Sequence, residues 1–124
     1  MEAANFVEAS AAAVSIPGTM LRDIFGAMKK AYEEIGYPEE WKNHTQGGIS
    51  NYRPCELGIN DISEIRLRVD DTISFNPTIS GVKSEESYLV GKDSTEQLCS
   101  DERWPGSRID IDGNSYYMTD ILEI

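Results

Sequence analysis

The sequence predicts an α+β domain in which two N-terminal helices pack on one face of an antiparallel sheet. Three observations lead to this fold class. Apolar residues recur at three- and four-residue spacings in the first third of the chain. Short runs in which apolar and polar residues alternate follow in the second half. An Asp-Gly pair between two β-favouring runs near the C-terminus is typical of a tight hairpin.

Length and charge restrict the kind of protein. We expect residues 1–124 to form a single domain, because 124 residues is close to the usual domain size. The net charge of −11 opposes binding to nucleic acids and to anionic membranes. Only two cysteines are present, and the N-terminus lacks the basic and apolar segments of a signal peptide. These features predict a cytoplasmic protein with reduced thiols.

The helical region has two parts. Residues 3–14 are rich in alanine and favour a helix by propensity. Residues 15–19 break that helix, and Thr19 is expected to cap the next one. Gly36 is expected to end the second helix in a left-handed conformation. The apolar stripe of the second helix, which we expect in the core, comprises Leu21, Ile24, Phe25, Met28, Tyr32 and Ile35.

Four segments after the helices favour strands. Residues 65–69 alternate apolar side chains with arginines, and residues 72–75 lead into Asn76-Pro77, where proline marks the end of a strand. Residues 84–90 predict a third strand, and residues 93–99 predict a short surface turn or helix. The tail predicts a hairpin with a type I′ turn at Asp112-Gly113.

The segment 41–56 contains the only histidine, His44, beside Gly47-Gly48. A metal site, an acid–base site, an anion-binding loop and an ordinary loop histidine all remain possible interpretations of His44. A phosphate loop is disfavoured because no lysine follows in a strand–loop–helix unit. A metal ion would require carboxylates from neighbouring strands, and Glu56 and Glu85 are the natural candidates.

Several ordered motifs resemble the C-terminal half of the pita-bread metallopeptidases, the group that contains methionine aminopeptidase, aminopeptidase P, prolidase and creatinase. The resemblance runs from about residue 17 to the C-terminus. It rests on Pro17-Gly18-Thr19 before an amphipathic helix, and on the glycine-rich segment that begins at His44. The strand that ends in Asn76-Pro77 resembles the family strand that ends in Glu-Pro. Residues 83–90 resemble the strand that carries the second glutamate.

This resemblance implies helices over a strongly curved antiparallel sheet and, in active relatives, a two-metal site of two Asp, one His and two Glu. Carried over by position, His44 would be the metal histidine and Glu85 the bridging glutamate, and Asn76 stands where a glutamate ligand is expected. The resemblance implies that the two aspartates would come from the family's preceding half, and we expect no residues of this sequence at matching positions. The metal would be Mn²⁺, Co²⁺ or Zn²⁺, or no metal would be bound at all.

Two functions follow from the resemblance. The first is a metallopeptidase-like domain that hydrolyses N-terminal or Xaa-Pro peptide bonds, with a truncated chain and an incomplete metal site. Tyr52 and Arg53 would contact the peptide substrate, and Glu56 would take a catalytic role. The second is a non-catalytic domain that binds a peptide or a protein in the same cleft. Because one half of a pseudo-symmetric domain leaves a sheet edge exposed, we expect a homodimer or a separate N-terminal half as partner.

Overall fold

The structure is a computed structural model that describes residues 2–43, 45–50, 57–79 and 81–120. Helical elements come first along the chain: α1 (Glu2–Ala13), α2 (Leu21–Glu34) and the short 3₁₀ helix η1 (Glu40–Asn43). Within these described residues the strands that follow are β1 (Gly47–Ser50), β2 (Leu57–Gly58), β3 (Thr72–Phe75), β4 (Thr78–Ile79), β5 (Val82–Lys83), β6 (Glu86–Val90), β7 (Thr95–Gln97), β8 (Gly106–Ile111) and β9 (Asn114–Thr119).

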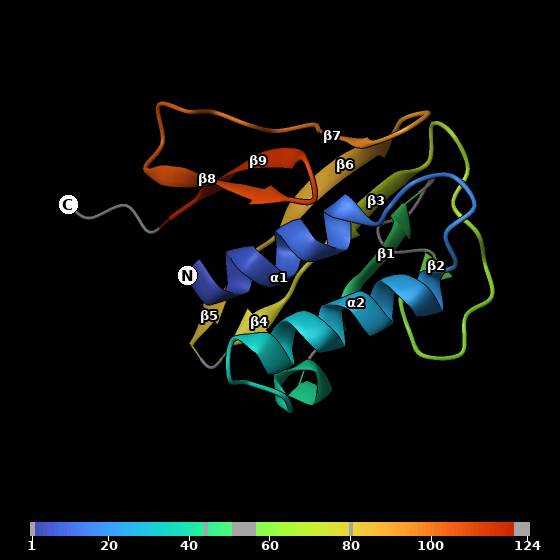
Figure 1. Ribbon diagram of the computed structural model, residues 1–124, viewed down its shortest axis with the longest axis horizontal. Coiled ribbons are helices and arrows are strands. Elements are labelled where there is room, and N and C mark those ends of the chain that lie inside the picture. Colours follow the sequence, from blue (N-terminus) through green and yellow to red (C-terminus); the bar gives the residue numbers. More distant parts are fainter. Residues whose placement is uncertain (1, 44, 51–56, 80, 121–124) are drawn as a thin grey trace.

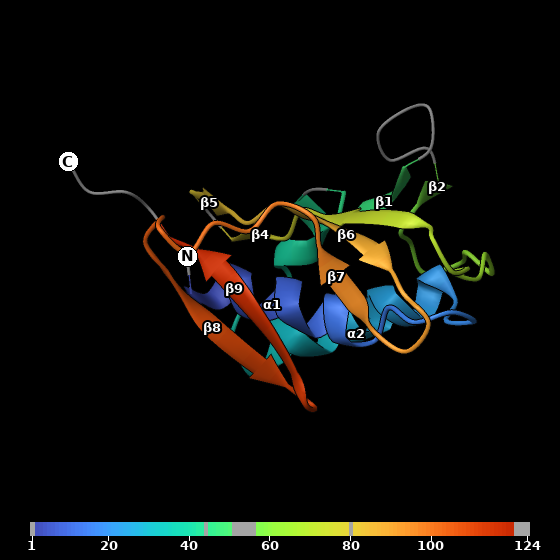
Figure 2. The same cartoon turned by 90° about the horizontal axis from the view of Figure 1, so that it is seen from above.

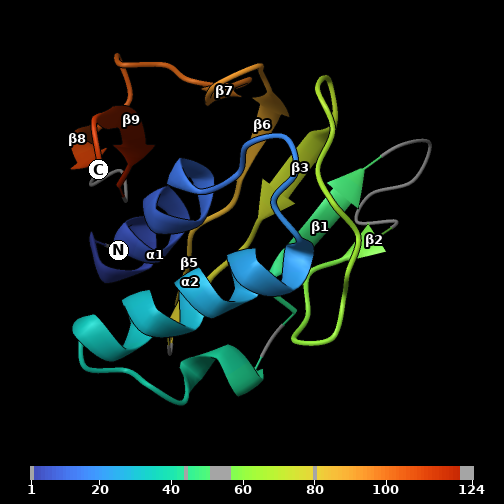
Figure 3. The same ribbon diagram turned by 45° about the vertical axis from the view of Figure 1, so that its right-hand side comes forward.

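The main sheet has five antiparallel strands in the order β2-β1-β3-β6-β7. Helices α1 and α2 lie side by side on one face of this sheet and run in opposite directions (Figures 1 and 3). Seen from above, the main sheet forms one layer and the helices a second layer, with the β8–β9 hairpin beside α1 (Figure 2). The β8–β9 hairpin packs against α1. The predicted α+β class, with two helices on an antiparallel sheet, is confirmed, and the sheet is open.

The core forms where the apolar stripe of α2 meets the inner face of the sheet. Leu21, Met28 and Tyr32 of the predicted stripe are all fully buried, which confirms that this face of α2 packs into the core. Gly36 takes a φ of +86°, and the N–H of Tyr37 donates to the carbonyl of Tyr32 at 2.9 Å. This pattern is a Schellman motif, which confirms the predicted C-terminal end of the helix. The sheet contributes Ile49, Ile73, Phe75, Tyr88 and Val90.

The N-terminus of α2 differs from the prediction. Thr19 does not cap the helix, because its hydroxyl donates to the carbonyl of Val14 at 2.9 Å and Met20 takes the N-cap position. The first N–H groups of α2 donate instead to backbone carbonyls of Ile65 and Ser63, at 2.9 and 3.1 Å. A backbone segment thus satisfies donors that a side-chain cap would otherwise have served.

That segment also corrects the predicted strand at residues 65–69. It is extended, but it pairs with the start of α2 through the isolated bridge between Met20 and Arg66, and it is not a strand of the sheet. Leu67 is buried, whereas Val69 is half exposed. The alternating pattern was correct about extension but could not identify the partner segment, which lies far away in the sequence.

The C-terminal half of the chain follows the prediction more closely. Asp112 and Gly113 have φ values of +48° and +84°, as the two central residues of a type I′ turn require. The expected surface turn or helix at residues 93–99 is wrong in part, because residues 95–97 form strand β7. No helix in the described part of the chain is long and apolar enough to cross a membrane.

Candidate functional site

The strands β3, β4, β5 and β6 form one interrupted hairpin. Phe75 pairs with Glu86, and Thr78 pairs with Lys83, so the two ladders share the same register. Between them, the N–H of Ser84 donates to the carbonyl of Pro77 at 3.1 Å. Continuing this register places Asn76 opposite Glu85. The hairpin therefore brings together two of the residues that the sequence predicted as metal ligands.

Asn76 is held at the edge of the buried region. Its backbone N–H donates to the carbonyl of Gln46 at 3.2 Å, which ties the end of β3 to the residue before β1. Its side-chain oxygen Oδ1 is buried and has no hydrogen-bond partner. A buried hydrogen-bond acceptor without a donor is uncommon in folded proteins, so this oxygen is a candidate for contact with a group that the structure does not contain.

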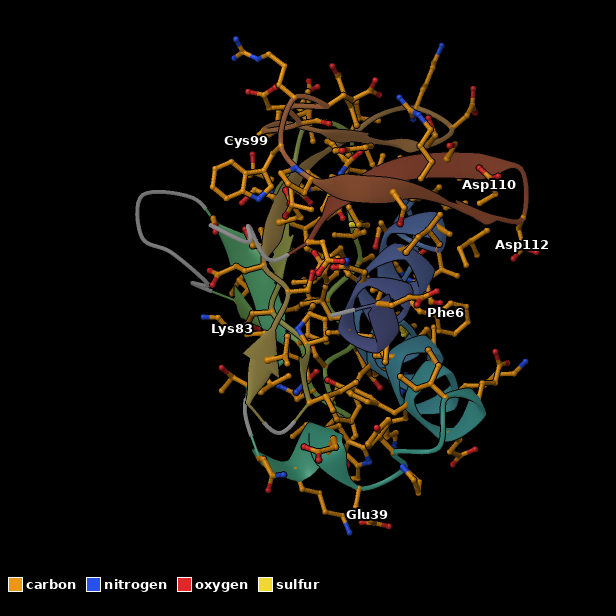
Figure 4. All side chains as sticks on the ribbon, turned by 90° about the vertical axis from the view of Figure 1, so that its left-hand side faces the viewer. Phe6, Glu39, Lys83, Cys99, Asp110 and Asp112 are labelled. Carbon is orange, nitrogen blue, oxygen red and sulfur yellow. The ribbon has the colours of Figure 1, made fainter. Side chains whose placement is uncertain are left out.

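Glu85 has a different environment. It is exposed, and its carboxylate oxygen Oε2 lies 2.7 Å from Nζ of Lys83. The carboxylate is therefore already neutralised in part by a neighbouring ammonium group. Figure 4 shows Lys83 on the side of the molecule opposite the helices. Glu86, the next residue, is half-buried, and burial raises the pKa of its carboxyl group.

Hydroxyl groups dominate the sheet face that points away from the helices. Strand alternation places Ser74 and Ser87 on this face, because their neighbours Ile73, Phe75 and Tyr88 are buried against the helices. The Oγ atoms of Ser74 and Ser87 are 2.7 Å apart and hydrogen-bonded. Hydroxyls of this kind can bind a peptide backbone, but they are weak ligands for two divalent ions.

A buried polar network fixes the end of the hairpin against α2. The hydroxyl of Tyr32 donates to Oε1 of Gln46 at 2.9 Å and accepts from the N–H of Thr78 at 3.0 Å. Nε2 of Gln46 in turn donates to the carbonyl of Trp41 at 3.3 Å. Burial raises the pKa of Tyr32 to about 12, so the phenol stays protonated and able to donate. Tyr32 belongs to the core, as predicted.

The remaining predicted site residues lie outside the described residues. These are His44, Tyr52, Arg53 and Glu56. Their assigned roles as metal ligand, substrate contacts and catalytic group therefore stay predictions, as do the ligand roles of Asn76 and Glu85. Among the residues that the structure describes, no group of three or more His, Cys, Asp and Glu side chains is close enough to hold a metal ion.

One buried acidic residue, Glu8, was not expected from the sequence. Glu8 lies on α1 with no solvent exposure, and neither carboxyl oxygen meets a donor with full hydrogen-bond geometry, although the phenol of Tyr88 and the backbone of Glu86 lie close enough to favour its charged form. Burial, followed by the nearby charge of Glu86, raises the pKa of Glu8 well above its usual value. The only sequence signal was its position among buried residues of an alanine-rich helix, four residues after Ala4 and three before Ala11.

No protein-family model matches the sequence, and no curated protein matches it either. Solved structures do match. The prolidase from Pyrococcus horikoshii OT3 superposes with a TM-score of 0.70 and 23% identity, over 82% of this chain and 30% of the prolidase. The dipeptidase PepE from Mycobacterium ulcerans gives 0.71 and 17%, over 81% of this chain and 28% of PepE. The chain has the pita-bread fold. The X-Pro aminopeptidase from Thermotoga maritima MSB8 agrees, with a TM-score of 0.66 and 15% identity over 82% of this chain and 30% of the aminopeptidase.

The likeness covers one part of each pita-bread structure. This chain spans about three-tenths of the length of the solved structures it matches, with shares of 28% and 30%. Such a share is consistent with the C-terminal half that the sequence motifs indicated. At this level of identity the comparisons establish the fold, and they leave activity to be argued from the residues of the site.

Proposed function

We propose that this chain is a pita-bread domain that binds peptides and does not hydrolyse them on its own. The supporting observation is the opposed pair Asn76 and Glu85. This pair presents a neutral amide and a carboxylate already engaged by Lys83. The proteins of known structure that share this fold include a dipeptidase, a prolidase and an X-Pro aminopeptidase, which supports a peptide as the ligand.

The described residues do not fit a two-metal site. Two divalent ions that activate a bridging water need several anionic ligands, and carboxylates usually supply them. Here the hydroxyls of Ser74 and Ser87 hydrogen-bond to each other beside an amide and a single exposed carboxylate. No hydrolytic step follows from these groups. A second copy of the chain or a separate N-terminal half would have to add carboxylates, and that association stays a prediction.

The same groups suit a peptide. Seryl hydroxyls donate and accept, so this face of β3 and β6 can satisfy both N–H and C=O groups of an extended chain. Because Glu85 is half exposed beside Lys83, the end of the hairpin also offers one charge of each sign for peptide termini.

A titration of the whole chain with the dipeptide Ala-Pro tests the proposal. We expect NMR shift changes at Ser74, Ser87 and Asn76, with no release of free proline. Calorimetry with Mn²⁺, Co²⁺ or Zn²⁺ should show no binding tighter than millimolar. Replacing Ser87→Val should weaken the dipeptide complex, whereas Ser107→Val on the exposed strand β8 should not. Micromolar metal binding that is lost in His44→Ala and Glu85→Gln would establish the metallopeptidase instead.

The substitution Asn76→Asp distinguishes the two functions by stability. It puts a negative charge at a buried oxygen without a donor, so we expect the free energy of unfolding to fall by about 1–3 kcal/mol. Millimolar Mn²⁺ should not restore the loss. The control Asn60→Asp, at an exposed Asx turn whose oxygen accepts from the N–H of Ile62, should change little. A thermal melt that recovers on adding Mn²⁺ would show that this position is a metal ligand.

A further inference from the structure

A groove runs along the helix layer on the side that faces away from the sheet. One cavity of about 420 Å³ lies between α1, α2 and the turn of the β8–β9 hairpin. A second cavity of about 510 Å³ lies near the ends of the two helices. Phe6 lines both, so the two cavities are neighbours on either side of this side chain. Figure 4 shows Phe6, Asp110 and Asp112 on this side of the molecule, with Lys83 on the opposite side.

Apolar side chains, several of them small, line part of the first cavity between its polar residues. Ala27 and Ala31 of α2 lie there with Phe6 of α1 and Val14, the residue after α1. Because alanine side chains are short, they leave space at the surface between the two packed helices. A cavity of this size is in the range that accommodates a ligand or one or two large apolar side chains.

The rim of the groove is acidic. Glu34, Asp110 and Asp112 border the first cavity, and Glu2 borders the second, against a single ammonium group on Lys30. Among the residues that the structure describes, none of these five side chains takes part in an ion pair. Most of their charge is therefore available to a ligand, and it would repel an anionic one.

We propose that this groove binds a peptide segment that carries a large apolar side chain next to lysine or arginine. The apolar side chain would enter between Ala27 and Phe6, and the cationic group would meet the carboxylates of Asp110, Asp112 and Glu34. This site lies on the helix layer, and the peptide-binding face proposed above lies on the sheet. The two proposals are therefore independent and can fail separately.

The probe is the peptide acetyl-Lys-Leu-Trp-Lys-Leu-amide, titrated into the ¹⁵N-labelled full chain. Its blocked ends remove the terminal charges that the sheet face could bind. We expect shift changes at Ala27, Ala31 and Ile111, and an affinity at least about tenfold higher than that of the matched peptide with glutamate in place of lysine. Binding should weaken as salt is added, because the rim is exposed.

Matched variants test the two parts of the groove. The double variant Asp110→Asn and Asp112→Asn removes two charges and keeps the turn, because asparagine also favours the left-handed conformation of Asp112. It should weaken the cationic peptide at least about fivefold, while the charge-matched control Asp61→Asn and Asp93→Asn, outside the groove, should not. Ala27→Met fills the first cavity and should abolish binding.

Three results would overturn the proposal. The first is equal binding of the cationic and the acidic peptide, and the second is no binding of either at millimolar concentration. The third is a set of shift changes confined to Ser74, Ser87 and their neighbours, which would assign the peptide to the sheet face. Should Ala27→Met fail to fold, the asparagine variants alone decide, since both substituted positions are exposed.

Discussion

The substitution Glu8→Met should raise the free energy of unfolding by about 1–3 kcal/mol, because it removes a buried carboxyl group that has no hydrogen-bond partner. Glu8 is fully buried on α1, with Glu86 and Tyr88 of β6 as its nearest polar neighbours. Methionine is unbranched and similar in length, so it can fill the same space without a polar atom. An increase in the free energy of unfolding on removal of this carboxyl group would show that Glu8 opposes folding.

The gain should also depend on pH. Burial, then Glu86, raises the pKa of Glu8 well above its usual value of 4.5. A raised pKa in the folded state means that Glu8 opposes folding least below pH 4.5, where it is protonated in both states. As the pH rises towards the folded pKa, the unfolded chain releases this proton first, and stability falls by up to about 1.4 kcal/mol per pH unit.

The acidic groups around Glu8 act in the same direction as burial. Glu86 on β6 and, more weakly, Glu85 just before that strand raise the pKa of Glu8, whereas the phenol of Tyr88 and the backbone of Glu86 lower it. The phenol of Tyr32 also faces Glu8 and adds no positive charge. Glu86 also has a raised pKa because of burial, so it should contribute a smaller slope of the same sign. Only the difference between the wild-type chain and Glu8→Met isolates Glu8.

Urea unfolding followed at pH 5, 6, 7 and 8 measures this difference. We expect the curves of the two proteins to diverge as the pH rises, and the control Glu33→Gln, at an exposed position on α2, to follow the wild type. Parallel curves, or a variant less stable than the wild type at pH 5, would show that Glu8 is satisfied in the folded state.

Local sequence patterns predicted the elements whose partners are close in the chain. The stripe of α2, its end at Gly36 and the turn at Asp112-Gly113 all depend on a few neighbouring residues, and all three were confirmed. The segment 65–69 was predicted as a sheet strand but pairs with the start of α2. The difference arises because alternation reports extended backbone and carries no information on the partner.

The sequence also predicted only some features of the candidate site. The motif resemblance named Asn76 and Glu85 as ligand positions, and the register of the ladders on either side of them sets the two residues opposite each other, while their ligand roles stay predictions. The ion pair of Glu85 with Lys83 and the unmet oxygen of Asn76 depend on side-chain geometry that no spacing reveals. Glu8 could not be recognised as buried, because an alanine-rich helix has no clear polar face against which to judge it.

Replacing Gly47→Ala should destabilise the chain by about 3 kcal/mol or more, because the new methyl group has no space. A Cβ at Gly47 would lie 2.0 Å from the carbonyl oxygen of Ser74, and its φ of +122° is one that other residues rarely adopt. The obstructing atom belongs to the backbone of β3, so it cannot move aside without breaking the ladder between β1 and β3. The Gly47-Gly48 step, which the sequence offered as an anion-binding loop, is thus required for strand packing.

The matched control is Gly26→Ala on the exposed face of α2, where a Cβ meets nothing within 4 Å. There the same methyl group should raise stability by about 0.5–1 kcal/mol, because alanine favours helix over glycine. If urea unfolding gives a lower free energy of unfolding for Gly47→Ala and a higher one for Gly26→Ala, the loss at Gly47 comes from its contacts with β3. If Gly47→Ala instead unfolds like the wild type, strands β1 and β3 are further apart than the structure places them, and a role for this glycine in binding a ligand regains support.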